Sequence, residues 1–453
     1  MIVFVIEIVV ALSVYLFFTK PQHGISIFSL IYFLVPSIGI VAIGGVALKW
    51  NYINAVLLIA LLYHATRSKG NTLFFKPLYP FIVYYVLLLL LIPFEWATPI
   101  DYQISSWIGA VFRYLVFPVA LCTFFKSGTK SQLCFLHYTI CSIILVCCLY
   151  CLFLTQMRGF NPYLAIFNAD MEHMELYFAA EDSGRIFGRI SSVFAHPMNF
   201  GCFLTCSFFY CTYLLLVKHN RWVLLLLAFI LLSALVCGVR SVLVAIFFGL
   251  AFFVLVNGKT KYIKYTIIFS LLFFVLMIQN DNVYDYISSI YDSSQADNVK
   301  GSNMEMRLRQ LSGCFIEMKE NPLFGKGYNW TIYYNQNYGN HPYCIAFESM
   351  IFVILCNWSV AGVLVWTWLL IRLYKTDYRY RKIRMDKSLI LMSLTTAFVT
   401  YICLTGDYGY NMFWIFFYAL IYIDMYHNYK QTKYGFESNR TLSTPVLSLP
   451  RER

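Results

Sequence analysis

Apolar stretches as long as a bilayer core is thick, about 20 residues, recur along the whole sequence. They lie at residues 2–19, 25–46, 52–64, 79–94, 105–125, 133–155, 197–217, 222–237, 241–257, 265–279, 345–371, 389–404 and 411–427. Only 12% of the 453 residues are charged, against about 25% in an ordinary soluble domain. The pattern predicts an all-α fold, a polytopic helical bundle with about 12–13 transmembrane helices.

The connections between these stretches alternate in charge. One set is basic and contains Arg67, Lys69, Lys76, Lys126, Lys130, Lys218, Arg221, Lys259, Lys261, Lys264, the segment 372–387, Lys430 and Lys433. Basic connections stay in the cytoplasm, so we expect the other set to face outward: 95–104, 156–196, 238–241, 280–344 and 405–411. The net charge of +12 then reflects membrane topology. We expect a lipid bilayer as the surroundings and no nucleic acid as a partner.

This topology divides the chain into five parts. Residues 1–196 hold the N-terminal transmembrane helices and the outer segment 156–196, and residues 197–279 hold the central helices. The large outer loop covers 280–344, the C-terminal helices cover 345–427, and residues 428–453 form a basic cytoplasmic tail.

Several cations break the charge pattern because they lie on the outer side or within a span, where charge is costly. We interpret Arg158, Arg185, Lys300, Arg309 and Lys319 as solvated loop residues. Arg189, Arg240 and Arg113 have more specific settings. Arg189 precedes the span at Pro197, and Arg240 lies in a short turn, where snorkelling to the interface is the alternative role. Arg113 lies deep in "SSWIGAVFRYLVFPVAL" and should face a polar cavity or a carboxylate.

The outer loop contains a predicted amphipathic helix with Arg307 at its edge. Its apolar positions follow helical spacing: Met304, Leu308, Leu311, Phe315 and Met318. Arg307 lies beside this stripe and is aimed toward the membrane side, whereas Arg309 points away to water. The helix should end at Asn321-Pro322, before the tight turn "FGKGY".

Two histidine–proline pairs, His196-Pro197 and His341-Pro342, each precede an outer-face span. Proline suits the first helical turn, which places each histidine near an N-cap. The helix dipole there favours neutral imidazole, able to accept a proton, although each histidine could simply cap its helix. Glu348 follows His341 by seven residues. An acid at this depth is a functional candidate or the partner of an arginine.

Cysteine usage gives little evidence of metal binding. Most of the fourteen cysteines lie within apolar runs and behave as small hydrophobic residues. Cys314 and Cys344 lie in a polar segment, where they could pair or remain free thiols. Because the Cys and His residues lack metal-ligand spacing, we expect neither a metal nor a cofactor.

Outer arginines beside a neutral histidine and an acid suit one kind of chemistry. Arginine forks bind phosphate oxygens and can stabilise a departing diphosphate. A neutral histidine can remove the proton of an attacking sugar hydroxyl. The expected substrate is a lipid diphosphate whose tail stays in the bilayer, and the expected reaction is transfer of its glycan to a hydroxyl.

Four stretches of the chain, in order, resemble the O-antigen ligase and O-antigen polymerase superfamily. "GRISSVFAHPMNFGCFL" is similar to the family's R-x-S/G-x-F-x-H-P-N pattern, and "VRSVL" to its Ser-Arg turn. The arginine helix followed by "NPLFGKGY", and then "NHPYCIAFESMIFVILCNWSVAGVL", resemble its periplasmic loop and the segment after it. The matches run from about residue 185 to 365; the N-terminal third agrees only in hydropathy.

The resemblance implies a bacterial inner-membrane enzyme whose site faces the periplasm. Its loop arginines would hold undecaprenyl diphosphate and its loop histidine would act as base; by motif these roles fall on Arg189, Arg307 and His341. From the chemistry above, Arg240 and Arg113 join the diphosphate contacts, Glu348 joins the catalytic groups, and His196 is a secondary candidate. The sequence departs from the family at Met198, Val239 and Pro342.

Polymerases and ligases of this family share one architecture and differ in their acceptor. A polymerase transfers the glycan to another undecaprenyl-diphosphate-linked oligosaccharide and can work with a chain-length regulator, whereas a ligase transfers it to lipid A–core. The Tyr-, Phe- and Ile-rich composition and "FES" at 347–349 look more like a polymerase. A polysaccharide flippase is the alternative from another class, but it would not need a large one-sided loop.

Overall fold

The computed structural model describes residues 2–35, 41–43, 46–48, 50–67, 74, 76–94, 97–157, 161–166, 189–218, 221–257, 304–382, 388–406 and 409–442. These residues are almost entirely helical, and the one hairpin among them has strands of three residues. The predicted all-α class is confirmed for this part of the chain. The predicted span 265–279 lies outside the described residues.

The first half of the chain contributes short and long helices around one small hairpin. Its elements are α1 (Ile2–Thr19), α2 (Pro21–Leu34), β1 (Val41–Ile43), β2 (Val46–Leu48), α3 (Trp50–Arg67), η1 (Lys76–Leu78), α4 (Tyr79–Leu91), η2 (Ile92–Phe94), α5 (Ile100–Tyr114), α6 (Val116–Phe125), α7 (Lys130–Leu154), η3 (Thr155–Met157) and α8 (Pro162–Ile166). The antiparallel strands pair Ala42 with Ala47.

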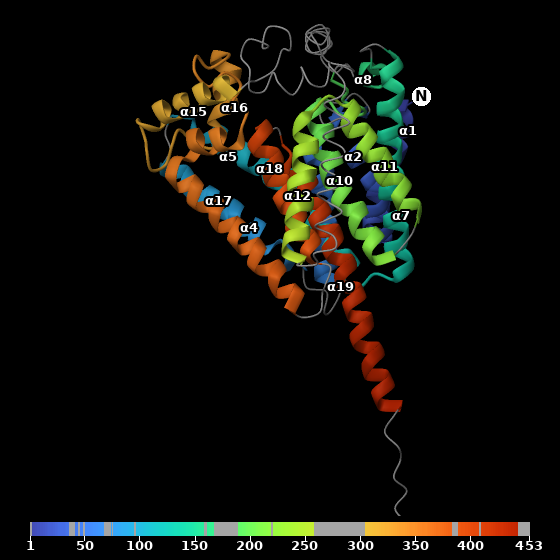
Figure 1. Ribbon diagram of the computed structural model, residues 1–453. Coiled ribbons are helices and arrows are strands. Elements are labelled where there is room, and N and C mark those ends of the chain that lie inside the picture. Colours follow the sequence, from blue (N-terminus) through green and yellow to red (C-terminus); the bar gives the residue numbers. More distant parts are fainter. Residues whose placement is uncertain are drawn as a thin grey trace, which may run out of the picture.

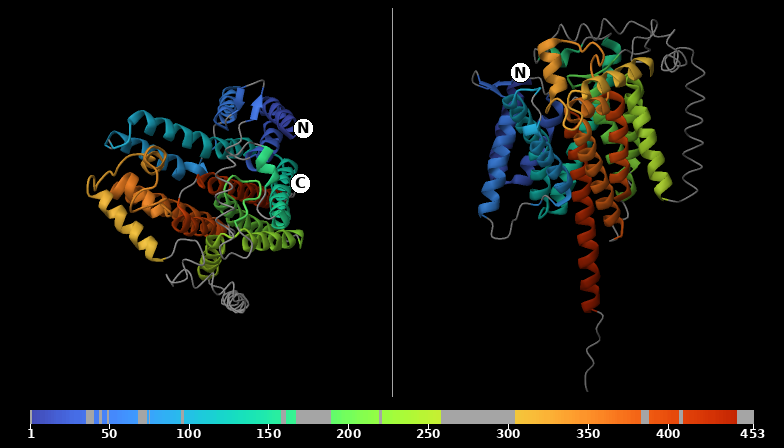
Figure 2. Two further views of the ribbon diagram at one scale, coloured as in Figure 1. Left: turned by 90° about the horizontal axis from the view of Figure 1, so that it is seen from above. Right: turned by 90° about the vertical axis from the view of Figure 1, so that its left-hand side faces the viewer.

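The second half supplies the helices that carry the site. They are α10 (Pro197–Lys218), α11 (Arg221–Val236), α12 (Arg240–Asn257), α15 (Met304–Met318), α16 (Trp330–Tyr338), α17 (Met350–Lys382), α18 (Leu389–Thr405) and α19 (Asn411–Leu442). Most run side by side through the bundle, while α15 and α16 lie at one end of it (Figure 1). The last turns of α19 extend from the other end, as both side views show (Figures 1 and 2).

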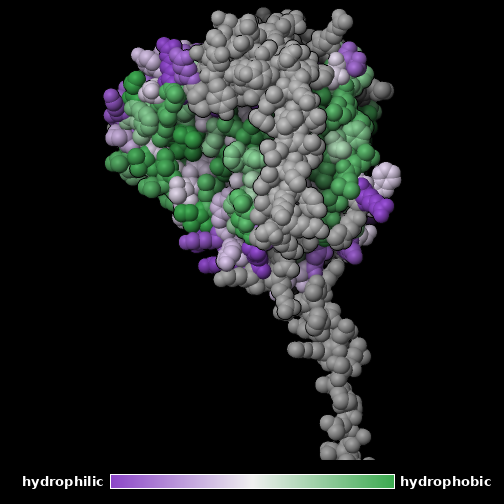
Figure 3. Space-filling model, viewed as in Figure 1, coloured by the Kyte–Doolittle hydropathy of each residue, from purple (hydrophilic) through white to green (hydrophobic). Residues whose placement is uncertain are grey.

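Six helical segments of the described chain are long and apolar enough to cross a membrane. They are Lys76–Phe94, Ile100–Phe125, Lys130–Met157, Pro197–Val217, Arg240–Asn257 and Met350–Arg381. Four shorter apolar helices accompany them: Phe4–Thr19, Tyr52–Arg67, Arg221–Val236 and Leu389–Thr405. Hydrophobic residues form a broad band between polar residues at the two ends (Figure 3). The molecule is therefore built as a membrane protein.

The predicted span 25–46 is wrong. Helix α2 ends at Leu34, and Val35 is extended, with ψ 124°. The residue before a proline is sterically excluded from the helical region, and Pro36 follows. Further along, Val41–Ile43 and Val46–Leu48 are paired strands and not part of a helix.

Helix ends meet at two ends of the bundle. At the first, which we call the basic end, the Lys126 ammonium lies 5.2 Å from the Phe74 ring, and Arg381 Nη1 donates to the Val256 carbonyl at 3.5 Å. The opposite end is tied together by hydrogen bonds between remote segments. One joins Tyr163 to Leu34 at 2.6 Å.

Close contacts hold the central helices together. A Cβ added at Gly249 of α12 would lie 2.3 Å from the Phe209 ring of α10 and 2.8 Å from Ala397 of α18. A small residue lets helices in a membrane approach closely, so Gly249 fixes the spacing of these three. Next to it, Phe398 of α18 stacks on Trp414 of α19 with centroids 4.3 Å apart. This packing fixes the position of α18, and the site is built around the carboxyl end of this helix.

Candidate functional site

The carboxyl end of α18 is bound by side chains from two remote segments. The last carbonyls of a helix lack partners within it and carry partial negative charge. Arg307 Nη2 of α15 donates to the Leu404 carbonyl at 2.8 Å, and the Ser349 hydroxyl donates to the Cys403 carbonyl at 2.7 Å. These two bonds bring α15 and the start of α17 to the same point.

The predicted orientation of Arg307 and Arg309 is confirmed. Helix α15 runs from Met304 to Met318 as expected; Arg307 is half-buried against α18 and Arg309 is exposed. The predicted apolar stripe, however, does not face the protein. Leu308 is 57% exposed and Phe315 51%. The buried face instead carries the smaller and polar residues that follow Arg307 at helical spacing: Gln310, Gly313 and Cys314.

Glu348 lies close enough to Arg307 to change its pKa. Burial lowers the pKa of Arg307, the Glu348 carboxylate raises it, and the Arg240 guanidinium lowers it further. Arginine nevertheless stays protonated in proteins. Glu348 Oε2 is buried and accepts no hydrogen bond from any described residue. The two arginines and this acid therefore share one electrostatic environment.

The residue after Arg189 is bonded to the turn that precedes Arg240. The Ile190 amide donates to the Cys237 carbonyl at 3.3 Å, in the turn between α11 and α12. Arg240 begins α12 directly after this turn, as the sequence predicts. We call Arg189, Arg240, Arg307, Glu348 and His196 the arginine cluster.

His196 caps α10, as predicted. The Met198 amide donates to His196 Nδ1 at 3.1 Å, so the neutral ring carries its proton on Nε2. Burial, and then the Arg189 charge, lower the pKa of His196 to about 4. The residue is therefore a neutral hydrogen-bond donor at neutral pH. A second bond holds this helix end, because the Tyr401 hydroxyl of α18 donates to the Met198 carbonyl at 2.6 Å.

Arg113 is directed at the turn that follows α18. A Cβ added at Gly409 would lie 3.7 Å from Arg113 Nη1. Ten residues earlier in α5, Gln103 Oε1 accepts from the Tyr328 amide at 2.7 Å. Both contacts lie at the end opposite the basic end, so α5 runs along that end. Arg113 thus lies near Gly409, and no described carboxylate is paired with it.

The position predicted for His341 is wrong. His341-Pro342 does not begin a helix: α17 starts at Met350, and His341 forms a backbone bridge with Ile345. Ile345 and Phe347 have positive φ, 47° and 51°, which keeps the segment before Met350 out of a helix. The proline therefore marks a turn.

Both ring nitrogens of His341 are already engaged. Nδ1 accepts from the Tyr343 and Cys344 amides at 3.2 and 3.0 Å, so Nε2 carries the proton and donates to Glu317 Oε1 at 3.2 Å. Glu317 lies ten residues after Arg307 on α15, about 15 Å along the helix. The structure thus places His341, which is 3% exposed, away from Arg307.

Lys326 completes this second group. Its ammonium pairs with Glu317 Oε2 at 3.2 Å and also with Glu320. Neither Glu317 nor Lys326 could be predicted as a partner of His341, because their distances from His341 along the chain match neither a helical nor a strand period. A buried base flanked by a buried ion pair indicates a role in holding the turn.

The segment 322–331 is inserted into a break in α17. Ser359 is non-helical, with φ 46°, and the carbonyls of Cys356 and Asn357 accept from the Lys326 and Gly327 amides, both at 3.0 Å. A Cβ at Gly325 would lie 2.6 Å from the Asn357 carbonyl. Only glycine allows this approach, which explains the "FGKGY" turn in physical terms.

A polar network at the basic end was missed by the sequence analysis. His137 of α7 bonds Tyr210 through Nδ1 at 2.7 Å and Asp424 Oδ1 through Nε2 at 2.8 Å. Asp424 Oδ2 accepts from Tyr213 at 2.7 Å and from Asn428 at 3.2 Å. The three helices involved, α7, α10 and α19, lie far apart in the sequence, so no local motif could reveal the network.

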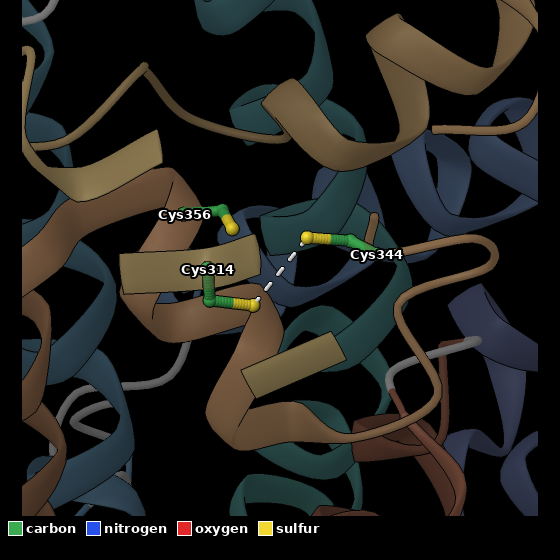
Figure 4. A group of neighbouring side chains, drawn as sticks. All are labelled: Cys314, Cys344 and Cys356. Atoms are coloured by element: carbon green, nitrogen blue, oxygen red, sulfur yellow. Dashed lines mark hydrogen bonds between the residues drawn. The ribbon is translucent and has the colours of Figure 1, made fainter. Parts of the chain in front are cut away.

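Three buried cysteines also converge beside the site. The sulfur atoms of Cys314, Cys344 and Cys356 lie within 4.8 Å of one another (Figure 4). The sequence analysis considered the first two and missed Cys356, because it lies in an apolar run.

The arginine cluster can bind an anion with more than one negative charge. Arg307 lies near both Arg240 and Glu348, Arg189 lies near His196, and arginine forks match phosphate oxygens. No family model matches this chain, and no curated protein matches it.

Proposed function

We propose that this chain is a polysaccharide polymerase of the bacterial inner membrane. It transfers a growing glycan from undecaprenyl diphosphate to a sugar hydroxyl of another lipid-linked repeat unit at the periplasmic face. The observation that carries the proposal is the proximity of Arg307 to Arg240 and Glu348 at one end of an apolar bundle, with Arg189 beside His196 in the segment bonded to the turn before α12. A lipid diphosphate can bring its charge there while its tail stays in the bilayer.

In the proposed reaction the guanidinium groups hold the diphosphate. The acceptor oxygen forms a bond to the anomeric carbon, the bond from that carbon to the phosphate oxygen breaks, and the diphosphate leaves with the electron pair. Arginines that stabilise the developing charge supply a large part of the catalysis. The Leu404 carbonyl fixes Arg307 for this role.

Glu348 is the better candidate for the base. A base needs an atom that can accept the hydroxyl proton. Glu348 Oε2 accepts no hydrogen bond from the described residues, whereas His341 uses both nitrogens. We therefore propose that Glu348 accepts the hydroxyl proton. His341 is then a positioning residue for the turn that carries Glu348.

The proposed topology has about 12–13 transmembrane helices and a periplasmic loop at 280–344. The basic end then lies in the cytoplasm, as the positive-inside rule requires. The arginine cluster and the ends of α15 and α16 face the periplasm. The proposed partner at that face is a chain-length regulator.

The deciding experiment is complementation of two bacterial strains, one lacking its polysaccharide polymerase and one lacking its ligase. Long polysaccharide should return only in the first strain. Restoration in the second strain alone would identify a ligase instead. A flippase would restore neither strain but would rescue one that lacks lipid-linked oligosaccharide export.

A further inference from the structure

The cysteine cluster joins three elements around the site. Cys314 lies on the buried face of α15, Cys344 in the turn after His341, and Cys356 in the outer part of α17. All three are buried, at most 1% exposed. Figure 4 shows the three sulfurs directed at one another.

Cys314 and Cys344 are the pair in direct contact. Their sulfurs are 3.7 Å apart. The glycine before Cys314 makes this approach possible, because a Cβ at Gly313 would lie 2.5 Å from Tyr343 Cβ and 3.0 Å from Cys344 Sγ. A disulfide needs sulfurs about 2.05 Å apart, which is within reach of side-chain rotation in this turn.

We propose that Cys314 and Cys344 form a disulfide that fastens α15 to the turn carrying Glu348. The oxidant is a disulfide of a thiol–disulfide exchange protein in the compartment outside the membrane, where such bonds persist. One thiolate attacks that disulfide, and the second thiol displaces the mixed disulfide. The two cysteines lose two protons and two electrons, and the oxidant leaves as two thiols.

Contact with Cys314, and then with Cys356, lowers the pKa of Cys344, while contact with Cys344 raises the pKa of Cys314. Cys344 is therefore the thiol that attacks first.

Burial favours a disulfide over a metal ion at this position. Three thiolates around a divalent cation leave a net negative charge in a buried site. The neighbouring ammonium, Lys326, already pairs with Glu317 and Glu320. A disulfide introduces no charge at all.

The consequence for the site is a covalent brace. Arg307 precedes Cys314 by seven residues, about 10 Å along α15, and Glu348 follows Cys344 by four. The bond would hold the two elements that carry the diphosphate contact and the base. This consequence depends on the proposed function, but the bond itself does not.

The test is peptide mapping of the full chain. Cells are lysed in N-ethylmaleimide to block free thiols, and the protein is purified in detergent without reductant and digested with trypsin. Cys314 falls on peptide 310–319, and both Cys344 and Cys356 fall on peptide 327–372. We expect the two peptides to be linked, and to separate after reduction.

Single Cys→Ser variants assign the bond. The link should persist in Cys356→Ser and be lost in Cys314→Ser and Cys344→Ser. The proposal is overturned if all three thiols carry maleimide, if the link is lost in Cys356→Ser, or if zinc or copper copurifies in stoichiometric amount and is released by these substitutions. A mapped link without polymer synthesis would leave the disulfide standing and refute only the proposed function.

Discussion

The arginine cluster and the His137–Asp424 network both place charged groups near an end of the same bundle, but their hydrogen bonding differs. In the network both histidine nitrogens and both Asp424 oxygens have hydrogen-bond partners at 2.7–3.2 Å. In the cluster Arg307 lies near Arg240 and Glu348, and Glu348 Oε2 has no hydrogen-bond partner among the described residues. A buried network in which every polar atom has a hydrogen-bond partner stabilises a fold. An excess of positive over negative side chains is instead suited to binding an anionic ligand. The following experiments test this difference.

Glu348→Gln should have the largest effect on activity. The amide keeps the size of the side chain but cannot take the hydroxyl proton, and general-base catalysis contributes about 10²–10⁴-fold. The assay is polymer formed per unit of folded protein in the polymerase-deficient strain. Retention of more than a tenth of the activity would remove Glu348 as the base.

Asp424→Ala should instead destabilise the fold. It leaves His137, Tyr213 and Asn428 without their acceptor in a buried site, which costs about 3–5 kcal/mol. Thermal unfolding in detergent measures the loss, and activity per folded molecule should stay at the wild-type value. Asp424→Asn, which keeps an acceptor oxygen, should lose less. A specific loss of activity without loss of stability would make the network functional.

Arg307→Ala should lower activity by about 10²–10³-fold, the cost of removing one fixed donor from a developing negative charge. Arg309→Ala is the matched control, two positions away on the same helix and exposed. Equal losses in the two variants would contradict the orientation of α15 as the reason for the effect.

Substitutions at His341 test whether this residue is the base or a positioning residue. His341→Ala removes the acceptor for two backbone amides, and displacement of a catalytic group by about 1 Å can cost ~10²-fold. His341→Asn restores an acceptor oxygen and should recover most of the activity. If the asparagine variant is as inactive as the alanine variant, His341 takes part in proton transfer.

The smallest effect is a pH dependence of stability at His196. Its pKa is about 4 in the folded protein and about 6.5 when unfolded, so between these values the unfolded state binds more protons. Its contribution is complete above pH 6.5 and declines as the pH falls toward 4. His196→Asn keeps the capping acceptor and should flatten the wild-type stability curve between pH 6.5 and 5; identical curves would contradict the assignment.

Hydropathy predicted most helices because burial in lipid requires long apolar runs. It predicted 389–404 and 241–257 to within one residue of α18 and α12. It failed at 25–46 and at His341, where apolar character continues through a backbone that proline turns out of the helix. In both places the proline was visible, but the same residue also begins helices, as Pro197 does.

The direction of a site residue could be predicted only where it depends on the spacing of residues within one helix. The inward direction of Arg307 followed from its angle to its neighbours on α15. The stripe itself does not line the buried face of α15: Leu308 and Phe315 are exposed, and the buried face carries Gln310, Gly313 and Cys314, which the apolar spacing did not indicate. Contacts between remote segments, such as Arg307 with Leu404 or His341 with Glu317, have no signal in a single sequence.

The break in α17 has a consequence for the order of assembly. The carbonyls of Cys356 and Asn357 are completed by amides of the segment 322–331, and the amide of Ala361 by the Leu323 carbonyl at 2.9 Å. In an apolar environment these groups cannot stay unpaired. Helix α17 therefore reaches its final form only after the segment 322–331 has folded against it, so the two halves of the break form together with that segment.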